Sequence, residues 1–328
     1  MAAVAAAAGV SQMTVSRYFK SPEKLAPATR ERVREAISET QYIFNALTAN
    51  LIHGVSRTVA FLTHSIDNPF YITMAVGIEE VLRKNGFLLY LGTVGTSGEN
   101  SRTHLELVLS HRIAGAILDM SAATNENMDL LKNHNVPVVL VDQSTRYTDS
   151  VRGDSYQAGK LLATHLCERG FRDIAFVGGP ADKQSLKDRL RGYKDVLYKH
   201  NLKPTVLLGS FDKESGRELT SELLERSDKA PEAIIAANNY VAVGCYEALK
   251  DFQLSVPEDI ALAAFDELEM NILKEPFLTV VAQPAYEIGA QAAKCLLNRV
   301  EGSSLAPRNI TLPVELRVRQ STTKSERK

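Results

Sequence analysis

The sequence predicts an α/β protein in which two doubly wound parallel-sheet lobes follow an all-α helix–turn–helix head. Residues 1–45 show only helical patterns, whereas from Arg57 onward short aliphatic runs alternate with amphipathic stretches. This alternation occurs twice, and the two sets open on similar strands, RTVAFL at 57–62 and RDIAFV at 172–177. Aliphatic strands separated by helices are typical of parallel sheets covered on both faces. Two such sets therefore predict two lobes.

The head is expected to contain three helices. Residues 2–8 form the first, because alanine has the highest helix propensity, and Gly9 ends it. Ser11 is a good N-cap for a second helix that runs to about Phe19. A third helix covers residues 27–40, since proline is favoured in a first helical turn.

The core elements follow in chain order. In the first set we expect strand 58–63, helix 70–84, strand 87–94, helix 101–111, strand 114–118, helix 127–133 and strand 137–141. In the second set we expect strand 174–177, helix 186–200, strand 206–208, helix 214–224, strand 233–236, helix 242–251 and strand 260–264.

The domain boundaries follow from these elements. We expect a head at 1–43, a hinge at 44–56, a first core lobe at 57–152 plus 283–307, a second core lobe at 153–282 plus 308–320, and a polar tail at 321–328. Ligands of such sheets bind at the carboxyl ends of the strands, so a ligand is expected in the cleft between the lobes.

Composition indicates a protein of the cytoplasm. The three cysteines, Cys167, Cys245 and Cys295, have neither disulfide nor zinc spacing and are expected to be buried hydrophobic side chains. No apolar run reaches transmembrane length, so no membrane partner is expected. Residues 1–58 carry a net charge of +3 and the remainder −4, which favours contact between the head and phosphate.

The second helix of the head has side chains suited to reading DNA. Gln12 can pair with adenine, Arg17 with guanine, and Met13 can touch a thymine methyl group. Hydroxyl and ammonium groups suited to phosphate oxygens lie on and around it, at Ser11, Thr14, Ser16 and Lys24. The alternative is a plain three-helix bundle with a polar face.

Polar residues follow several predicted strands of the core, at the edge where a ligand would bind. They are Asn68 with Phe70, Asp142, Asn238 and Asp266. Carboxylates and amides that converge on a cleft suit a ligand with several hydroxyl groups, which favours a sugar. The alternative is that these residues only form turns and cap helices.

The sequence resembles the lactose-repressor/galactose-repressor family of bacterial regulators over essentially its whole length. The family's Val-Ala-x-x-Ala-Gly-Val-Ser-x-x-Thr-Val-Ser-Arg run matches residues 4–17, and its hinge matches residues 42–51 in part, including Asn45 and Leu51. The resemblance implies that Leu51 enters the minor groove. Phe44 and Ala49 replace the usual hinge proline and basic residue, and the chain begins inside the first helix of the family, so that helix is expected to be clipped.

The same resemblance implies ligand-binding residues in the core. Arg189 matches an arginine that donates to ligand hydroxyls or a carboxylate, and Phe211 matches an aromatic lid residue. Gln283 falls in a segment that crosses between the lobes, and Asn239 stands where the family has aspartate. Arg152 near an expected crossover favours a sugar acid over a neutral sugar; the alternative is that Arg152 is a solvated loop residue.

Three function classes result. The first is a homodimeric, DNA-binding transcriptional regulator, expected to repress, whose operator affinity a sugar or sugar acid controls. The second is a cytoplasmic sugar sensor with an impaired head. The third is an enzyme, which we do not expect, because residues 153–160 only approximate a P-loop and no nucleophile–base or metal constellation is present. No cofactor and no metal are expected.

Overall fold

The computed structural model describes residues 1–42, 56–95, 101–226, 229–268 and 276–323. It divides into two compact units, Met1–Ser56 and Arg57–Lys328, called here the head and the core. Within the described ranges no helix is both long enough and apolar enough to cross a membrane.

The head is a three-helix unit with a small core of its own. Its helices are α1 (Ala2–Ala8), α2 (Gln12–Lys20) and α3 (Pro27–Thr40), with a short 3-10 turn η1 (Pro22–Lys24) between the last two. Gly9 ends α1 in a left-handed conformation with φ of 62°, which glycine adopts without steric cost. Val4, Val15 and Val33, one from each helix, are fully buried against one another. The predicted helices of the head are confirmed.

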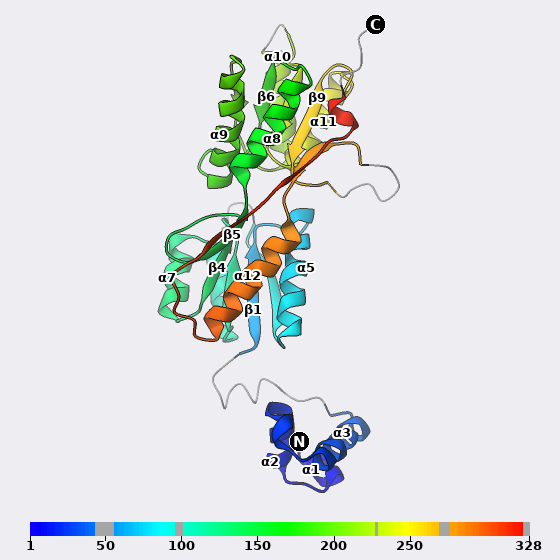
Figure 1. Ribbon diagram of the computed structural model, residues 1–328, viewed down its shortest axis with the longest axis vertical. Helices are drawn as coiled ribbons and strands as arrows, with labels where there is room; N and C mark the ends of the chain where they lie inside the picture. The colour runs from blue at the N-terminus through cyan, green and yellow to red at the C-terminus, as the bar shows by residue number, and fades with distance from the viewer. Residues whose placement is uncertain (43–55, 96–100, 227–228, 269–275, 324–328) are drawn as a thin grey trace. The chain divides into compact units, whose positions relative to one another are not determined.

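The core consists of two lobes, each built on a six-stranded sheet (Figure 1). The first sheet has the order β11-β5-β4-β3-β1-β2, and all its neighbouring strands are parallel. Its strands are β1 (Thr58–Thr63), β2 (Leu88–Thr93), β3 (Gly115–Leu118), β4 (Val138–Val141), β5 (Asp149–Gly153) and β11 (Asn309–Leu312). Its helices are α5 (Pro69–Lys84), α6 (Ser101–Ser110), α7 (Asn125–Asn133) and α12 (Ala285–Val300).

The second sheet has the order β12-β10-β9-β8-β6-β7, and only β12 is antiparallel to its neighbour. Its strands are β6 (Ile174–Val177), β7 (Thr205–Leu207), β8 (Ala233–Ala236), β9 (Ala261–Phe265), β10 (Thr279–Ala282) and β12 (Glu315–Arg317). Its helices are α8 (Ser155–Glu168), α9 (Gln184–Lys199), α10 (Lys213–Glu225) and α11 (Asn239–Asp251). The predicted class, two doubly wound lobes that follow a helical head in the sequence, is confirmed.

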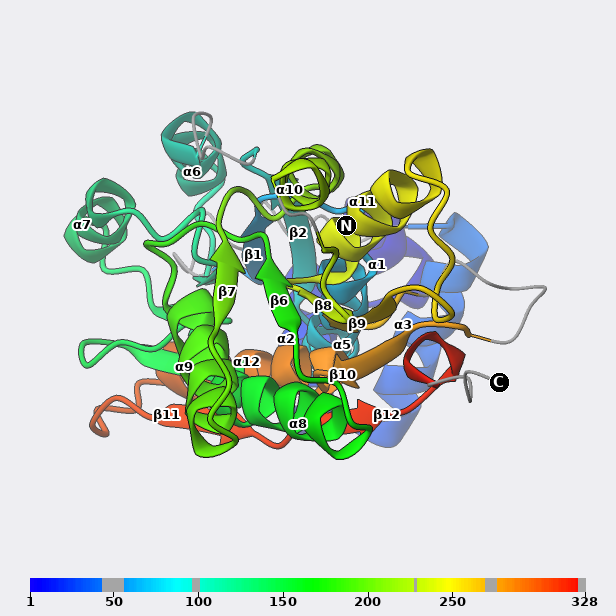
Figure 2. The same cartoon turned by 90° about the horizontal axis from the view of Figure 1, so that it is seen from above.

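Helices cover both faces of each sheet. In the second lobe, α8 and α9 lie on one face and α10 and α11 on the other (Figure 2). Successive side chains of a strand point to opposite faces, so Ile235 packs toward α8 and α9 while Ile234 packs toward α11. In the first lobe, Phe61 faces α5 and α12, and Leu62 faces the side of α6 and α7. This two-sided burial explains why the strands are continuous aliphatic runs.

Three chain segments connect the lobes, after β5, after β10 and after β11. The sequence predicts residues 308–320 in the second lobe, and this is wrong for the first part of that range, because β11 pairs with β5 in the first sheet. The third crossover therefore comes between Leu312 and Glu315, where the chain runs up to the second lobe in Figure 1.

The C-terminal segment docks on the second lobe, which corrects the expectation of a polar tail from residue 321. Ser321 and Thr322 are fully buried in a 3-10 turn, η2 (Gln320–Thr322). The Ser321 hydroxyl donates to the Leu262 carbonyl and accepts from the Thr279 amide, while Thr322 pairs with His165 at 2.8 Å. Hydroxyl groups can be buried here because each finds a partner.

Candidate functional site

A cavity of about 440 Å³ lies at the carboxyl ends of the strands, between the lobes. The first lobe lines it with His64, Ser65, Asp67, Tyr71, Met120, Ser121 and Asp142, and the second with Pro180, Lys183, Ser210, Phe211, Asp212 and Tyr240. The lining combines aromatic rings with polar groups, which suits a small ligand with both apolar faces and hydroxyl groups.

Asp142 is a buried carboxylate with an unused acceptor. It follows β4 in a left-handed conformation with φ of 56°, and the residue is 7% exposed. Its Oδ1 atom has no hydrogen-bonding partner among the described residues. Burial is the main cause that raises the pKa of Asp142 to about 7; the charges of Asp266 and Asp119 act in the same direction, and that of Arg189 opposes them. The site can therefore present this side chain as a carboxylic acid or as a carboxylate near neutral pH.

His64 lines the cavity and is paired with Asp119, and the sequence reasoning missed both residues. Asp119 follows β3 and is fully buried; its Oδ2 accepts from the Thr63 hydroxyl and the His64 amide and lies 3.2 Å from His64 Nδ1. The His64 ring meets the Tyr71 ring edge-on at 4.6 Å. Burial and the charges of Asp119 and Asp142 raise the pKa of Tyr71 well above its usual value, so its hydroxyl stays protonated.

Arg189 lies behind the cavity and is held by the second lobe. Its guanidinium donates to the Ala237 carbonyl at 2.6 Å, lies 3.5 Å from Asp266 Oδ2 and stacks 4.6 Å from the centre of the Phe265 ring. The residue is 3% exposed, and its Nε has no partner among the described residues. Gln283 donates to the other oxygen of Asp266 at 2.8 Å.

Two glycines set the position of Arg189. A Cβ on Gly159 of α8 would lie 2.1 Å from the Arg189 carbonyl oxygen, and one on Gly192 of α9 would lie 2.2 Å from the Tyr156 carbonyl oxygen. Only glycine at both positions lets α8 and α9 approach this closely. The sequence between β5 and α9 thus positions the arginine as well as building the lobe.

The two predicted asparagines of the cleft act first as helix caps. Asn238 accepts from the Val241 amide at the start of α11 and donates to the Phe211 carbonyl, so it also fixes the loop that carries the Phe211 ring. Asn68 accepts from the Phe70 amide at the start of α5 and pairs with Asn239 of the second lobe. Both asparagines therefore cap helices, as the alternative predicted, and each also contacts a residue near the cleft.

Five of the predicted cleft residues line one of two cavities, whereas Asn68, Arg189 and Asn238 line neither. Asp142 and Phe211 line the large one, whereas Phe70, Asp266 and Gln283 line a second cavity of about 220 Å³. The Phe70 side chain is buried in the first-lobe core between α5 and α12, so the structure does not bring it to the large cavity. Among the described residues no group of three or more His, Cys, Asp or Glu side chains is placed to hold a metal.

Helix α2 presents the predicted reading residues at the surface of the head. Ser11 caps the helix, since its hydroxyl accepts from the Thr14 amide at 3.2 Å. Gln12, Met13 and Arg17 are exposed, and Met13 is 72% exposed, an unusual place for a large apolar side chain.

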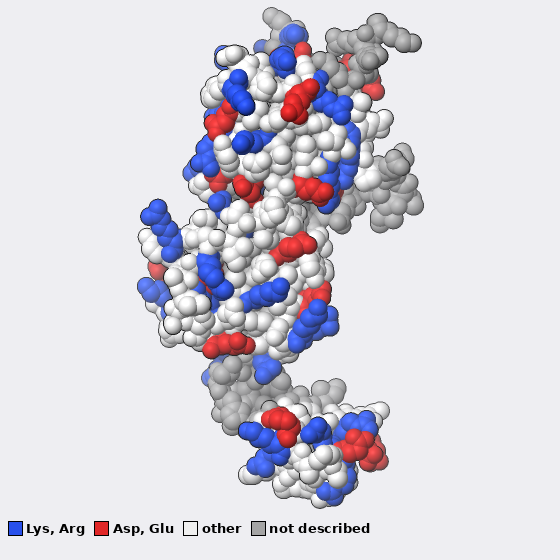
Figure 3. Space-filling model, viewed as in Figure 1, with Lys and Arg blue, Asp and Glu red and all other residues white. Residues whose placement is uncertain are grey.

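The phosphate-contact candidates differ in their surroundings. Lys24 is exposed in η1 and Ser16 is half-buried, whereas the Thr14 hydroxyl lies 2.9 Å from that of Ser11. Basic and acidic side chains both lie on the visible face of the head (Figure 3). The hinge candidates Asn45 and Leu51 lie outside the described residues.

Family models match both units. The model described as "periplasmic binding proteins and sugar binding domain of LacI family" matches residues 56–320. The model described as "bacterial regulatory proteins, lacI family" matches residues 1–45.

Individual relatives match over nearly the whole chain. The HTH-type transcriptional repressor PurR of Aliivibrio salmonicida is 30% identical, with 98% of both chains covered. Among solved structures, the lac repressor dimer bound to operator and the anti-inducer ONPF is 27% identical, with a TM-score of 0.83 and 98% of both chains covered. A LacI family transcriptional regulator of Enterococcus faecium with bound ribose is 29% identical, with a TM-score of 0.74, and covers 82% of this chain and 100% of its own. All three are transcriptional regulators rather than enzymes.

Proposed function

The chain belongs to the LacI family of bacterial regulatory proteins, and from that membership we propose that it is a transcriptional repressor whose affinity for operator DNA is controlled by a small sugar or sugar acid bound between the core lobes. The observation that carries the ligand part is the cavity lined by Asp142, whose buried Oδ1 atom has no hydrogen-bonding partner among the described residues. Its cellular compartment is the cytoplasm, where the DNA lies.

In the head, we propose that α2 enters the major groove. Gln12 and Arg17 are exposed and carry the side chains that pair bidentately with adenine and guanine. Met13 then touches a thymine methyl group, while Ser16 and Lys24 contact phosphate. Ser11 and Thr14 bond to each other in the free head and can turn to phosphate only by giving up that contact. Residues 44–56 are proposed as the hinge, with Asn45 and Leu51 meeting the minor groove.

In the core, we propose that the ligand lies between Phe211 and the His64–Asp119 pair. Its hydroxyl groups would bond to Asp142 and to Arg189, whose unpaired Oδ1 and Nε atoms are buried. Asn238, Asp266 and Gln283 hold these groups in place through the contacts described above. The ribose bound to the Enterococcus faecium regulator supports a sugar of that size. Arg152 does not support a sugar acid, because it pairs with Asp188 at 3.0 Å.

We propose that the protein acts as a homodimer, because one head reads too few bases for a specific site. The outward face of α5 exposes Ile72 and Val76, one helical turn apart, and both are more than 40% exposed. In the second lobe, Tyr246 of α11 lies against Phe277 and is also exposed. The dimer in the lac repressor structure supports this assembly. Light scattering that finds only monomer at micromolar concentration, with and without DNA, would contradict it.

The function is tested by selecting binders from a random double-stranded DNA library with the full chain at near-physiological salt. We expect recovery of a palindrome whose centre is an easily kinked, self-complementary step such as TA or CG. The Arg17→Ala variant should weaken binding by about 1–3 kcal/mol for each half-site and relax the choice of one base pair there. Folded protein that enriches no sequence would favour the alternative, a sugar sensor with an impaired head.

A further inference from the structure

The turn that follows β9 bonds to several separate segments of the core. Its two residues, Asp266 and Glu267, are adjacent in sequence, and Asp266 has a left-handed φ of 68°. The Asp266 side chain reaches Arg189 and Gln283, and Gln283 comes directly after β10, in the second crossover. The turn is therefore bonded at once to the cleft and to a segment that connects the lobes.

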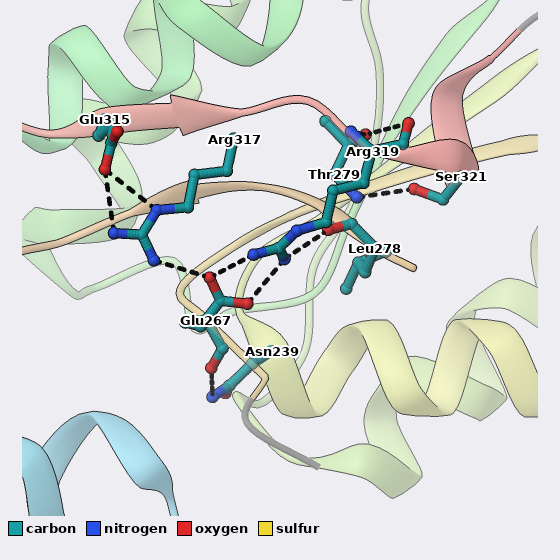
Figure 4. Close-up of polar contacts among 8 residues, drawn as sticks. All are labelled: Asn239, Glu267, Leu278, Thr279, Glu315, Arg317, Arg319 and Ser321. Carbon is teal, nitrogen blue, oxygen red and sulfur yellow. Dashed lines mark hydrogen bonds and ion pairs between the residues drawn. The ribbon is translucent and has the colours of Figure 1, made fainter. Parts of the chain in front are cut away.

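Glu267 joins the turn to β12 and to Arg319 just after it, the segment that follows the third crossover (Figure 4). Arg319 donates to both oxygens of Glu267, at 2.7 and 2.8 Å, and Arg317 donates to Oε2 at 3.0 Å. Arg317 belongs to β12, the first element after the chain leaves the first lobe, and is itself held by Glu315 at 2.9 Å. Bidentate guanidinium–carboxylate pairs fix direction as well as distance.

The charge state of Glu267 suits this role. Burial alone would raise its pKa, but hydrogen bonds from Arg319 and Arg317 lower the pKa below its usual value. Glu267 is therefore a carboxylate at neutral pH. The same Arg319 guanidinium also donates to the Leu278 carbonyl, just before β10, so the clamp is anchored in the second sheet.

The backbone of Glu267 joins the turn to the first lobe. Asn239 Nδ2 donates to the Glu267 carbonyl at 3.0 Å and to Asn68 Oδ1 at 3.0 Å, and Asn68 Nδ2 donates back to Asn239 Oδ1 at 3.0 Å. Asn239 is fully buried and Asn68 nearly so. An aspartate at 239 could donate neither bond, so this bridge between the lobes depends on the amide.

We propose that Glu267 is a positioning residue that couples the arrangement of the lobes to the ligand cleft. The Arg317–Arg319 clamp holds its side chain, its carbonyl holds the Asn239–Asn68 bridge, and its neighbour Asp266 holds Arg189. A shift of the third crossover therefore moves the anchor of Arg189, and a ligand that pulls on Arg189 moves the crossover. The inference rests on the proposed sensor function for its biological meaning, but its physical content concerns the core alone.

The test measures the distance between the lobes in the full chain, without DNA or ligand, so that it does not depend on the proposed function. Nitroxide labels on Asn133→Cys in α7 and Glu218→Cys in α10 report this distance by pulsed electron spin resonance. The native thiols of Cys167, Cys245 and Cys295 are buried, and burial raises their pKa. The two introduced, exposed cysteines therefore react with the nitroxide reagent first. Dilution with unlabelled protein restricts the signal to labels on one chain.

Two variants break the coupling at different bonds. Glu267→Gln removes the charge that Arg317 and Arg319 hold, and Asn239→Asp removes both amide donors. We expect each to raise the population of a second inter-lobe distance by at least about 5-fold, the lower range of a typical coupling between sites. Thermal unfolding should stay cooperative, because a shift of the lobes leaves the core of each lobe intact. The matched control, Asp251→Asn, removes a carboxylate that Arg217 holds at 2.8 Å on the second lobe and should leave the distance unchanged.

A distance distribution in both variants that matches the parent chain would overturn the proposal. Loss of the fold in both would also overturn it, since the cluster would then be needed for folding rather than for positioning. If Glu267→Gln alone fails to fold, Asn239→Asp decides, because it leaves the clamp of Arg317 and Arg319 in place.

Discussion

Two buried carboxylates of the first lobe, Asp149 and Asp142, have opposite surroundings. Asp149 begins β5, at the amino end of the strand and away from the cleft. Arg299 donates to both its oxygens at 3.0 and 2.9 Å, and the amide and guanidinium of Arg308 also donate to it. Asp142 ends β4 at the cleft, where its Oδ1 has no partner among the described residues. Burial alone would raise the pKa of Asp149, yet these bonds lower it to about 2, whereas burial raises that of Asp142 to about 7.

This difference in partners distinguishes Asp149, which stabilises the fold, from Asp142, which is available to a ligand. Removing one partner of a buried ion pair is costly, because the other charge is left without a partner. A buried charge that has no partner destabilises the protein as long as no ligand is bound. The fold tolerates such a group only where another molecule can complete its bonds, as is expected at functional sites. Asp142 is therefore the group whose removal should help stability and harm function.

The largest effect is expected from Asp149→Asn. The change leaves Arg299 and Arg308 without their shared charge, so the free energy of unfolding should fall by about 3–5 kcal/mol. Because the folded-state pKa of Asp149 lies below its ordinary value of 3.8, its contribution is present above that pH and is lost as pH falls toward about 2. Urea unfolding at pH 7 and pH 3 measures both effects. A variant as stable as the parent at pH 7 would contradict the claim that Asp149 stabilises the fold.

The next effect has the opposite sign. The folded-state pKa of Asp142 is raised from 3.8 to about 7, so the parent chain should lose stability as pH rises between these values. Asp142→Asn removes that loss and should raise the free energy of unfolding at pH 8 by up to about 4 kcal/mol, with little change at pH 4. Asparagine also suits the left-handed backbone of this position. Thermal unfolding across pH measures this effect, and an unchanged pH profile would contradict it.

The smallest effect is expected from Asp212, a carboxylate that lines the cavity and also caps α10. Its side chain accepts from the Ser215 amide at 2.8 Å. Asp212→Ala should therefore lower the free energy of unfolding by about 1 kcal/mol. Asp212→Asn keeps the cap and serves as the matched control in the same denaturant series. Equal losses in both variants would mean that charge, not capping, is what this residue contributes.

The sequence predicted the elements whose signal is local. Strands 58–63, 174–177 and 233–236 have the bounds that the structure gives, because each is a buried aliphatic run. Strand β5 was missed because its sequence, DSVRG, is polar, and its polar groups find partners in distant segments, such as Arg299, Arg308 and Asp188. No local pattern carries such a pairing.

The site was predictable where it follows strand ends. Asp142, Asn238 and Asp266 lie at the cleft edge for that reason, and Asp119 after β3 had the same signal but was not used. Phe70 could not be placed from sequence, because the rotation of α5 against α12 decides whether its ring faces the cavity or the core. His64 follows β1 and Asp119 follows β3, so their pairing depends on the two strands being neighbours in the sheet, which the sequence alone does not show.

The most direct test of the account measures the affinity of the full chain for its selected palindrome in the presence of a panel of sugars and sugar acids. It is made with the parent chain and with Arg189→Ala. We expect at least one compound to change the operator Kd of the parent by 5-fold or more, about 1 kcal/mol of coupling, and to leave that of the variant unchanged. A response of equal size in both chains, or operator binding lost in the variant without ligand, would contradict a cleft in which Arg189 receives the ligand.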